Sequence, residues 1–367
     1  MKVFDPETTP LNDGRLIAIE ASAGTGKTYT IECLVARLLM DDVVPADEIV
    51  VVTFTKAAAA ELRARIRQRL LKNLRAVEVE DSQGERAAKM RQHLANFSQI
   101  RISTIHGFAQ RTLLALGESV SNLEPALDSK EVRKSLLADV LRNLPPHDVD
   151  AVTSIPKFAS WLDEAISAMM NNPAAEITAM DANEHTTLIA DITQRVRATL
   201  EQRKRQLGVT SYDDLLTRLA IRMKNEADRD AVAASIGALL IDEFQDTDAL
   251  QWESFCRIAE YGRLAAFVVV GDPKQAIYGF RGGDVQVYQE AVLPADRFDL
   301  LNNYRSTSNF IEAENHFFEA FIADSKSSAK NYTANFGVDF DGLPMADGVV
   351  MPAHINFTPI QAAGRLS

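Results

Sequence analysis

The sequence predicts an α/β protein with a mainly parallel sheet, because short apolar runs alternate with longer stretches of helical periodicity. Runs with the composition of buried strands occupy residues 15–21, 49–52, 238–241 and 267–270. Continuous apolar runs are typical of parallel strands that are buried on both faces. The 367 residues, 46% of them hydrophobic, can form more than one core, so two or three domains are expected.

The first of these strands leads into a phosphate-binding loop. The stretch EASAGTGKTYT, residues 20–30, is rich in small residues, so that its N–H groups can converge on a phosphate. Lys27 is expected to contact the outer phosphates of a nucleoside triphosphate, and Thr28 to bind Mg²⁺. The alternative is a chance glycine-rich turn, in which Ala21 stands at the first glycine position of the usual pattern. The order strand, loop and helix favours the nucleotide site, for which the predicted residues are Ala23, Gly24, Thr25, Gly26, Lys27, Thr28 and Tyr29.

A pair of carboxylates follows another strand, as ATP hydrolysis requires. In ALLIDEFQDTD, residues 238–248, Asp242 and Glu243 come at the carboxyl end of a buried run. We expect Asp242 to bind Mg²⁺ and Glu243 to orient or deprotonate the attacking water. An acidic turn is common after a strand, so this assignment depends on the phosphate loop being present as well.

Polar and aromatic residues also end the neighbouring strands. Phe54 and Thr55 follow the run at 49–52, and His106 follows the strand-like segment QIRIST. Such residues could contact a single nucleic-acid strand through its phosphates and bases, although His106 taken alone favours a core histidine.

The loop after the run at 267–270 could contact both ligands. In GDPKQAIYGFRGGD, Gln275 could sense a γ-phosphate, while Tyr278 and Phe280 could stack on bases or belong to the core.

A helical insertion is predicted between the phosphate loop and the carboxylates. Residues 111–206 contain amphipathic stretches such as KEVRKSLLADVLRNL and FASWLDEAISAMM, separated by polar breaks. Trp161 in this segment is predicted to be a core residue.

Composition limits the function classes. No apolar stretch approaches the length of a membrane span and the N-terminus lacks a signal peptide, which predicts a cytoplasmic protein with no membrane partner. Two cysteines, Cys33 and Cys256, support neither a disulfide framework nor a zinc site. The net charge of −12 argues weakly against a nucleic-acid partner, because phosphate contacts need local positive charge.

Six blocks in a fixed order resemble the motif set of superfamily 1 DNA helicases of the UvrD/Rep type. They are EASAGTGKT, VVTFTKAAAAELRARI, ISTIHGFAQRTL, LLIDEFQDTD, VVGDPKQAIYGFRGGD and LNNYRST. Within this superfamily the opening segment, SYDDLL and GDPKQAIYGFRG are most similar to the RecB branch, the beta subunits of exodeoxyribonuclease V. The glutamine with which UvrD-type relatives select adenine is absent upstream of the loop, which leaves base selectivity open.

The resemblance implies a role for each matching position, with ATP and Mg²⁺ as cofactors. Lys27, Asp242, Glu243, Gln275 and Arg305 would serve catalysis, with Thr28 and Asp242 as metal ligands. Tyr304 would stack on adenine beside Arg305. The residues that resemble single-stranded DNA contacts are Phe54, Thr55, His106, Tyr278 and Phe280, and here the resemblance favours a DNA contact at His106 over a core histidine.

The resemblance also implies a domain plan. A RecA-like P-loop motor domain would comprise residues 1–110 and 207–300, interrupted by an all-helical subdomain at 111–206, and residues 301–367 would begin a second RecA-like domain. The chain is expected to be the amino-terminal part of a larger helicase that acts on single-stranded and duplex-end DNA with RecC- and RecD-like subunits. Two alternatives are an ATP- and DNA-binding module with negligible turnover, and an RNA or metabolic P-loop enzyme.

Overall fold

The computed structural model describes residues 2–307, apart from residues 12–13, 82–83, 119, 121–129, 147, 151–156, 172–176, 178–183, 208–209 and 277–284. Its centre is a six-stranded sheet in the order β3-β2-β4-β5-β1-β6, in which every neighbouring pair is parallel. The strands are β1 (Leu16–Ala21), β2 (Ile49–Thr53), β3 (Arg101–Thr104), β4 (Ala238–Ile241), β5 (Ala266–Gly271) and β6 (Asp296–Leu300). The predicted parallel α/β fold is therefore confirmed.

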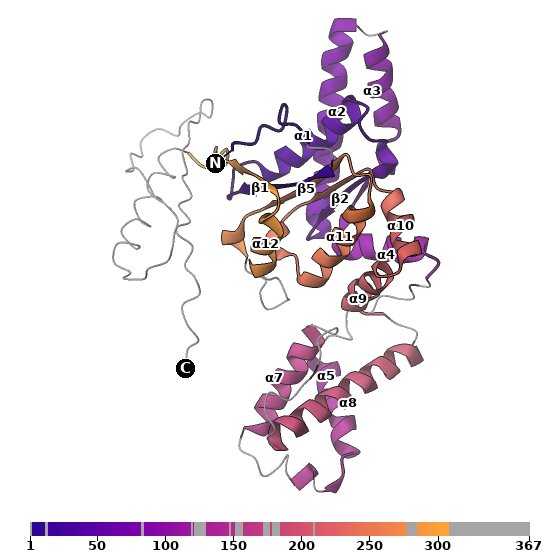
Figure 1. The fold of residues 1–367 in the computed structure, drawn as a ribbon, viewed down its shortest axis with the longest axis vertical. Coiled ribbons are helices and arrows are strands. Elements are labelled where there is room, and N and C mark those ends of the chain that lie inside the picture. Colours follow the sequence, from indigo (N-terminus) through magenta and orange to yellow (C-terminus); the bar gives the residue numbers. More distant parts are fainter. Residues whose placement is uncertain are drawn as a thin grey trace, which may run out of the picture.

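Helices cover both faces of the sheet, as Figure 1 shows. On one face lie α1 (Lys27–Met40), α2 (Lys56–Asp81) and α3 (Glu85–Ala95). On the other lie α4 (Ile105–Ala115), α9 (Tyr212–Met223), α10 (Glu226–Ala234), α11 (Ala249–Tyr261) and α12 (Val285–Val292). Among the described residues, four single-turn helices complete this part: η2 (Ala46–Glu48), η3 (Phe97–Gln99), η5 (Phe244–Asp246) and η6 (Pro273–Gln275).

The central strands β2, β4 and β5 are almost entirely apolar because they bury side chains in two separate cores. Successive residues of a strand point to opposite faces. Val51 and Leu240 accordingly pack against the α1–α2 side, whereas their neighbours Val50 and Leu239 pack against the α4–α11 side. All four side chains are fully buried.

Polar residues set the starts of several helices. The Thr104 hydroxyl accepts a hydrogen bond from the Gly107 N–H (3.1 Å) and caps α4. Ser211 and Asp214 form a reciprocal capping box at α9, and Asp248 caps α11. Each cap satisfies N–H groups that the first turn of a helix leaves without a backbone acceptor.

Three helices of the predicted insertion form a core of their own. They are α5 (Lys130–Arg142), α7 (Phe158–Asn171) and α8 (Glu184–Leu207), and in Figure 1 they lie in a bundle away from the sheet. Their shared apolar cluster includes Leu136, Phe158, Leu162, Ile166, Ile192 and Val196. At the start of this segment, α4 continues to Ala115 and still packs Leu113 on the sheet. No helix within the described residues is both long and apolar enough to cross a bilayer.

The prediction for Trp161 is wrong. Phe158, Leu162 and Ile166 recur at four-residue spacing and form the buried face of α7. Trp161 lies off this face and is 44% exposed. Helical periodicity thus outweighs the general tendency of tryptophan to be buried.

Truncation at these two positions is expected to have unequal effects on stability. Ile166→Ala should cost about 3 kcal/mol in the free energy of unfolding, because it opens a cavity in a fully buried cluster. Trp161→Ala should cost about 1 kcal/mol, because much of its ring is already in water. Urea unfolding followed by far-UV circular dichroism measures both values. Equal losses of stability in the two variants would contradict the assignment of Ile166 to the buried face of α7 and of Trp161 to its exposed side.

Candidate nucleotide site at the carboxyl edge of the sheet

The phosphate loop, residues 22–26, joins the end of β1 to the start of α1. Two of its residues have positive φ, Gly24 at +80° and Gly26 at +95°. A Cβ added to Gly24 would lie 2.5 Å from the Asn303 Oδ1 atom, which is closer than atoms approach one another. Glycine is needed here both for the backbone angle and for the close approach of a second segment.

That second segment, residues 302–306, is fixed on the loop by Asn303. The side chain of Asn303 is buried, and its Nδ2 donates to the carbonyl of Ala23 (3.1 Å). Its Oδ1 accepts from the N–H groups of Arg305 (2.8 Å) and Ser306 (3.2 Å). The Tyr304 N–H donates to the Gly24 carbonyl (2.7 Å). Asn303 lies within the quoted motif LNNYRST, but its structural role was not predicted.

The loop opens into a cavity of about 800 Å³, a volume within the range of nucleotide-sized ligand sites. It brings together the predicted phosphate-loop residues, Glu243, Gln275, Tyr304 and Arg305, and adds Val3, Phe4, Pro6 and Arg65. Tyr29 and Tyr304 line it with exposed rings, 45% and 62% respectively. The amino-terminal segment reaches the cavity because Val3 and Phe4 pair with Asp299 of β6.

Lys27 and Glu243 face each other across the site. The Lys27 Nζ lies 3.5 Å from the Glu243 Oε2, and it also donates to the Ala21 carbonyl (3.4 Å). Glu243 has a φ of +50°, which is strained for a residue with a side chain. The structure thus holds the predicted phosphate ligand against the predicted base.

Asp242 ends β4 as a buried carboxylate. Its Oδ2 accepts from the Thr53 hydroxyl (3.3 Å), whereas its Oδ1 is buried with no hydrogen-bond partner within the described residues. Burial, followed by the charge of Glu243, raises the pKa of Asp242 to about 7. A buried, unpaired carboxylate oxygen is costly unless a cation neutralises it. The donor set of Asp242 and Thr28 therefore fits Mg²⁺, which prefers oxygen ligands.

A chain of buried and partly buried hydrogen bonds links Glu243 to Gln275. The Gln245 side chain is 3% exposed. Its Nε2 donates to the Glu243 Oε2 (2.8 Å), and its Oε1 accepts from the N–H of Asp272 (2.9 Å). The Asp272 Oδ2 in turn accepts from the Gln275 Nε2 (2.7 Å). Gln245 was not predicted as a site residue, yet it connects the ends of β4 and β5.

The predicted DNA-contacting residues lie at the ends of β2 and β3. The Thr55 hydroxyl caps α2 by accepting from the Ala58 N–H (3.0 Å), and its side chain is exposed. Phe54 lines a small recess beside Asp242. His106 is half-buried, with its ring edge-on to Tyr212 at 5.1 Å. The two predicted stacking residues Tyr278 and Phe280 lie outside the described residues.

Most of the site lies within a segment that matches a known family model, whereas Asn303, Tyr304 and Arg305 follow that segment. Residues 7–293 match the UvrD/REP helicase N-terminal domain. The chain belongs to the UvrD/REP helicase family. This match agrees with the resemblance given by the six motifs.

Curated relatives of this UvrD/REP helicase chain include RecB and PcrA proteins. The RecBCD enzyme subunit RecB of Mycobacterium tuberculosis is 33% identical, over 82% of this chain and 29% of its own length. RecB of Escherichia coli is 26% identical, over 91% of this chain and 41% of its own length. The ATP-dependent DNA helicase PcrA of Staphylococcus epidermidis is 27% identical, over 91% of this chain and 41% of its own length. The chain thus spans less than half the length of these relatives.

Removal of Asn303 should weaken nucleotide binding. Asn303→Ala leaves the Ala23 carbonyl and two N–H groups without partners, so a fluorescent ATP analogue should bind about tenfold more weakly. Asn302→Ala is the matched control, because Asn302 is exposed and its side chain contacts the Tyr304 hydroxyl at 3.4 Å. Titration with Mg²⁺ present measures both affinities. Equal losses in the two variants would contradict the role of Asn303 in fixing residues 302–306 on the phosphate loop.

Asp246 should make stability depend on pH. Burial, followed by the charge of Glu243, raises the pKa of Asp246 from 3.8 to about 6. The folded protein therefore favours the neutral carboxyl, and ionisation costs stability as the pH rises from about 4 to above 6. Asp246→Asn removes this cost, so the variant should be more stable than the parent above pH 6, and the difference should disappear toward pH 4.

Thermal unfolding across this pH range, without nucleotide or Mg²⁺, measures the difference. Asp41→Asn, which removes an exposed carboxylate just after α1, is the control for a general loss of charge. A difference that stays constant with pH would show that the Asp246 carboxyl is not the titrating group.

Proposed function

We propose that the chain is the first motor domain of an ATP-dependent DNA helicase of the RecB type. The observation that carries this proposal is the meeting of Lys27, Glu243 and Gln275 around one cavity, in a chain of the UvrD/REP helicase family. The proposed domain plan assigns residues 1–110 and 207–300 to the motor domain, 111–206 to a helical insertion, and 301–367 to the start of a second motor domain.

In this proposal Lys27 releases Glu243 when a nucleotide binds. Phosphate oxygens would compete for the Lys27 ammonium, which now pairs with Glu243. Glu243 would then be available to orient a water molecule and accept its proton. Asp242 and Thr28 would hold Mg²⁺, which neutralises charge on the phosphates when bound. Arg305 would add a second positive charge from the segment fixed by Asn303.

The hydrogen-bond chain through Gln245 would couple the nucleotide site to the proposed DNA contacts. Gln275 would contact the γ-phosphate, and the residues that follow it include Tyr278 and Phe280, proposed to stack on DNA bases. A change at Gln275 would alter the Asp272 and Gln245 contacts, and so the position of Glu243. One loop would thus connect the state of the nucleotide to the contacts that bind DNA.

We propose single-stranded DNA as the substrate of the track formed by Phe54, Thr55 and His106. The RecB relatives are named as subunits of the RecBCD enzyme. By analogy we propose a cytoplasmic role at duplex ends in double-strand break repair and recombination, with RecC- and RecD-like partners. A second candidate is a module that binds Mg-ATP and DNA with negligible turnover, since the matched segment corresponds to the N-terminal domain of a helicase.

ATP hydrolysis by the 367-residue chain, with and without single-stranded DNA, tests the proposal. We expect a fluorescent ATP analogue to bind with Mg²⁺, and Lys27→Ala to weaken that binding by at least about tenfold. We expect the 367-residue chain to turn over ATP only weakly on its own. That turnover should rise with DNA and fall by about 10²-fold or more in Glu243→Gln, which keeps the size of the side chain but removes its basicity.

The outcomes separate the candidates. Binding of both ligands without turnover would favour the binding module. Hydrolysis that ignores DNA, in a protein that binds no single strand, would contradict the helicase proposal and favour another kind of P-loop enzyme.

A further inference from the structure

A second cavity, remote from the nucleotide site, lies along the outer edge of β3. It has a volume of about 660 Å³ and is bounded by α2 on one side and by the start of α4 on the other. Because β3 is the outermost strand at this end of the sheet, the groove runs beside a strand edge that no other strand of the described residues covers. The nucleotide cavity lies near β1 and β6 at the opposite end.

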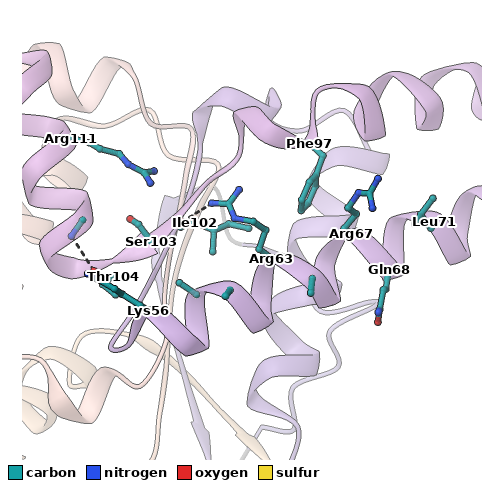
Figure 2. A pocket seen from close by; sticks show the side chains of 14 residues that line it. Lys56, Arg63, Arg67, Gln68, Leu71, Phe97, Ile102, Ser103, Thr104 and Arg111 are labelled. Atoms are coloured by element: carbon teal, nitrogen blue, oxygen red, sulfur yellow. Dashed lines mark hydrogen bonds between the residues drawn. The ribbon is translucent and has the colours of Figure 1, made fainter.

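The groove is lined by basic and apolar residues, in a protein that is acidic overall. Its cations are Lys56, Arg63 and Arg67 of α2 and Arg111 of α4. None of the described residues that line it is acidic, although the whole chain has a net charge of −12. Figure 2 shows the guanidinium groups of Arg63 and Arg111 directed toward β3 from its two sides.

Most of these cations are unneutralised. Within the described part of the chain, Lys56, Arg67 and Arg111 form no ion pair or hydrogen bond, and their residues are exposed. Arg63 differs, because its Nη2 donates to the carbonyl of Ile102 at 2.8 Å and so covers the open strand edge. That contact gives Arg63 a structural role, as charged residues often have at strand edges. It does not account for Arg67 and Arg111.

The chemistry of the groove suits a phosphate backbone better than bases. The half-buried Thr104, whose hydroxyl caps α4, lies beside the cations, whereas Ser103 is 6% exposed. Phe97 is 7% exposed and Ile102 is 2% exposed, so the aromatic ring in the lining is not available to stack on a base. Arginine side chains that converge without acidic partners bind phosphate groups independently of sequence.

The groove also opens at the proposed DNA track. Lys56 directly follows Thr55, and Gly107, which lines the groove, directly follows His106. We propose that the groove binds the phosphates of the single DNA strand where it continues past the motor over the β3 edge. This inference rests on the proposed DNA-binding function and adds a second contact region, with Arg67 and Arg111 as its phosphate ligands.

Binding of a fluorescent oligothymidine of about 30 nucleotides to the 367-residue chain, measured by anisotropy over a range of salt concentrations, tests the inference. Arg67→Ala/Arg111→Ala should weaken binding about tenfold at low salt. The slope of log affinity against log salt should fall in magnitude by about 1.4, since each single-strand phosphate contact contributes about 0.7. Arg67→Ala alone should give about half that change.

The matched control is Arg75→Ala/Arg86→Ala. It removes the same charge from exposed positions on α2 and α3 that do not line the groove. It should leave the slope unchanged, and both double variants should bind the ATP analogue like the parent. An oligoadenosine should show the same losses as the oligothymidine, because phosphates rather than bases are contacted.

Other results would overturn the inference in distinguishable ways. If the parent and the groove variant bind DNA equally, the groove does not bind DNA, and the proposed motor function still stands. The basic groove would then be a candidate site for an acidic segment of a partner protein. If the control lowers the slope as much as the groove variant, the loss of affinity comes from the overall charge of the protein and not from contacts in the groove. If the parent binds the ATP analogue but no DNA at low salt, both the groove and the helicase proposal fail.

Discussion

The register of the parallel sheet is the constraint on which the site depends. Glu20 of β1 is paired with Gly271 of β5, and Ile241 of β4 with Val269 of β5, so these strands end at nearly the same level. Their carboxyl ends then present the phosphate loop, the carboxylates and Gln275 along one edge. A shift of one residue in β4 would turn Asp242 to the other face of the sheet.

Charge balance around β4 explains why this edge is suited to a nucleotide and a cation. Three carboxyl groups, those of Asp242, Glu243 and Asp246, lie near the ammonium group of Lys27. Two of them have pKa values raised by burial and by the charge of Glu243, so the folded protein carries an unfavourable charge there at neutral pH. The strained backbone of Glu243 adds a further cost. Costs of this kind are expected where function, rather than stability, determines the residues.

Much of the fold and the nucleotide site could be predicted from the sequence, because local signals determine them. Continuous apolar runs indicated four of the six strands, and the strand-like segment QIRIST indicated β3. Strand β6 was missed, since Asp296, Arg297 and Asp299 make it a charged edge strand. Asn303 and Gln245 were missed for a different reason. Their roles depend on partners 280 and 27 positions away, at Ala23 and Asp272, and no local pattern encodes such contacts.

The contact between the phosphate loop and residues 302–306 has a mechanical consequence. Gly24 contacts Tyr304 through backbone groups, and Ala23 contacts Asn303 through a buried amide, so neither side can shift alone without losing hydrogen bonds. A phosphate that draws the loop toward itself must therefore also displace Tyr304 and Arg305, or break these bonds at a cost of about 1 kcal/mol each. Such a linkage lets the occupancy of the loop bias the position of the chain that follows β6, as conversion of nucleotide binding into movement requires.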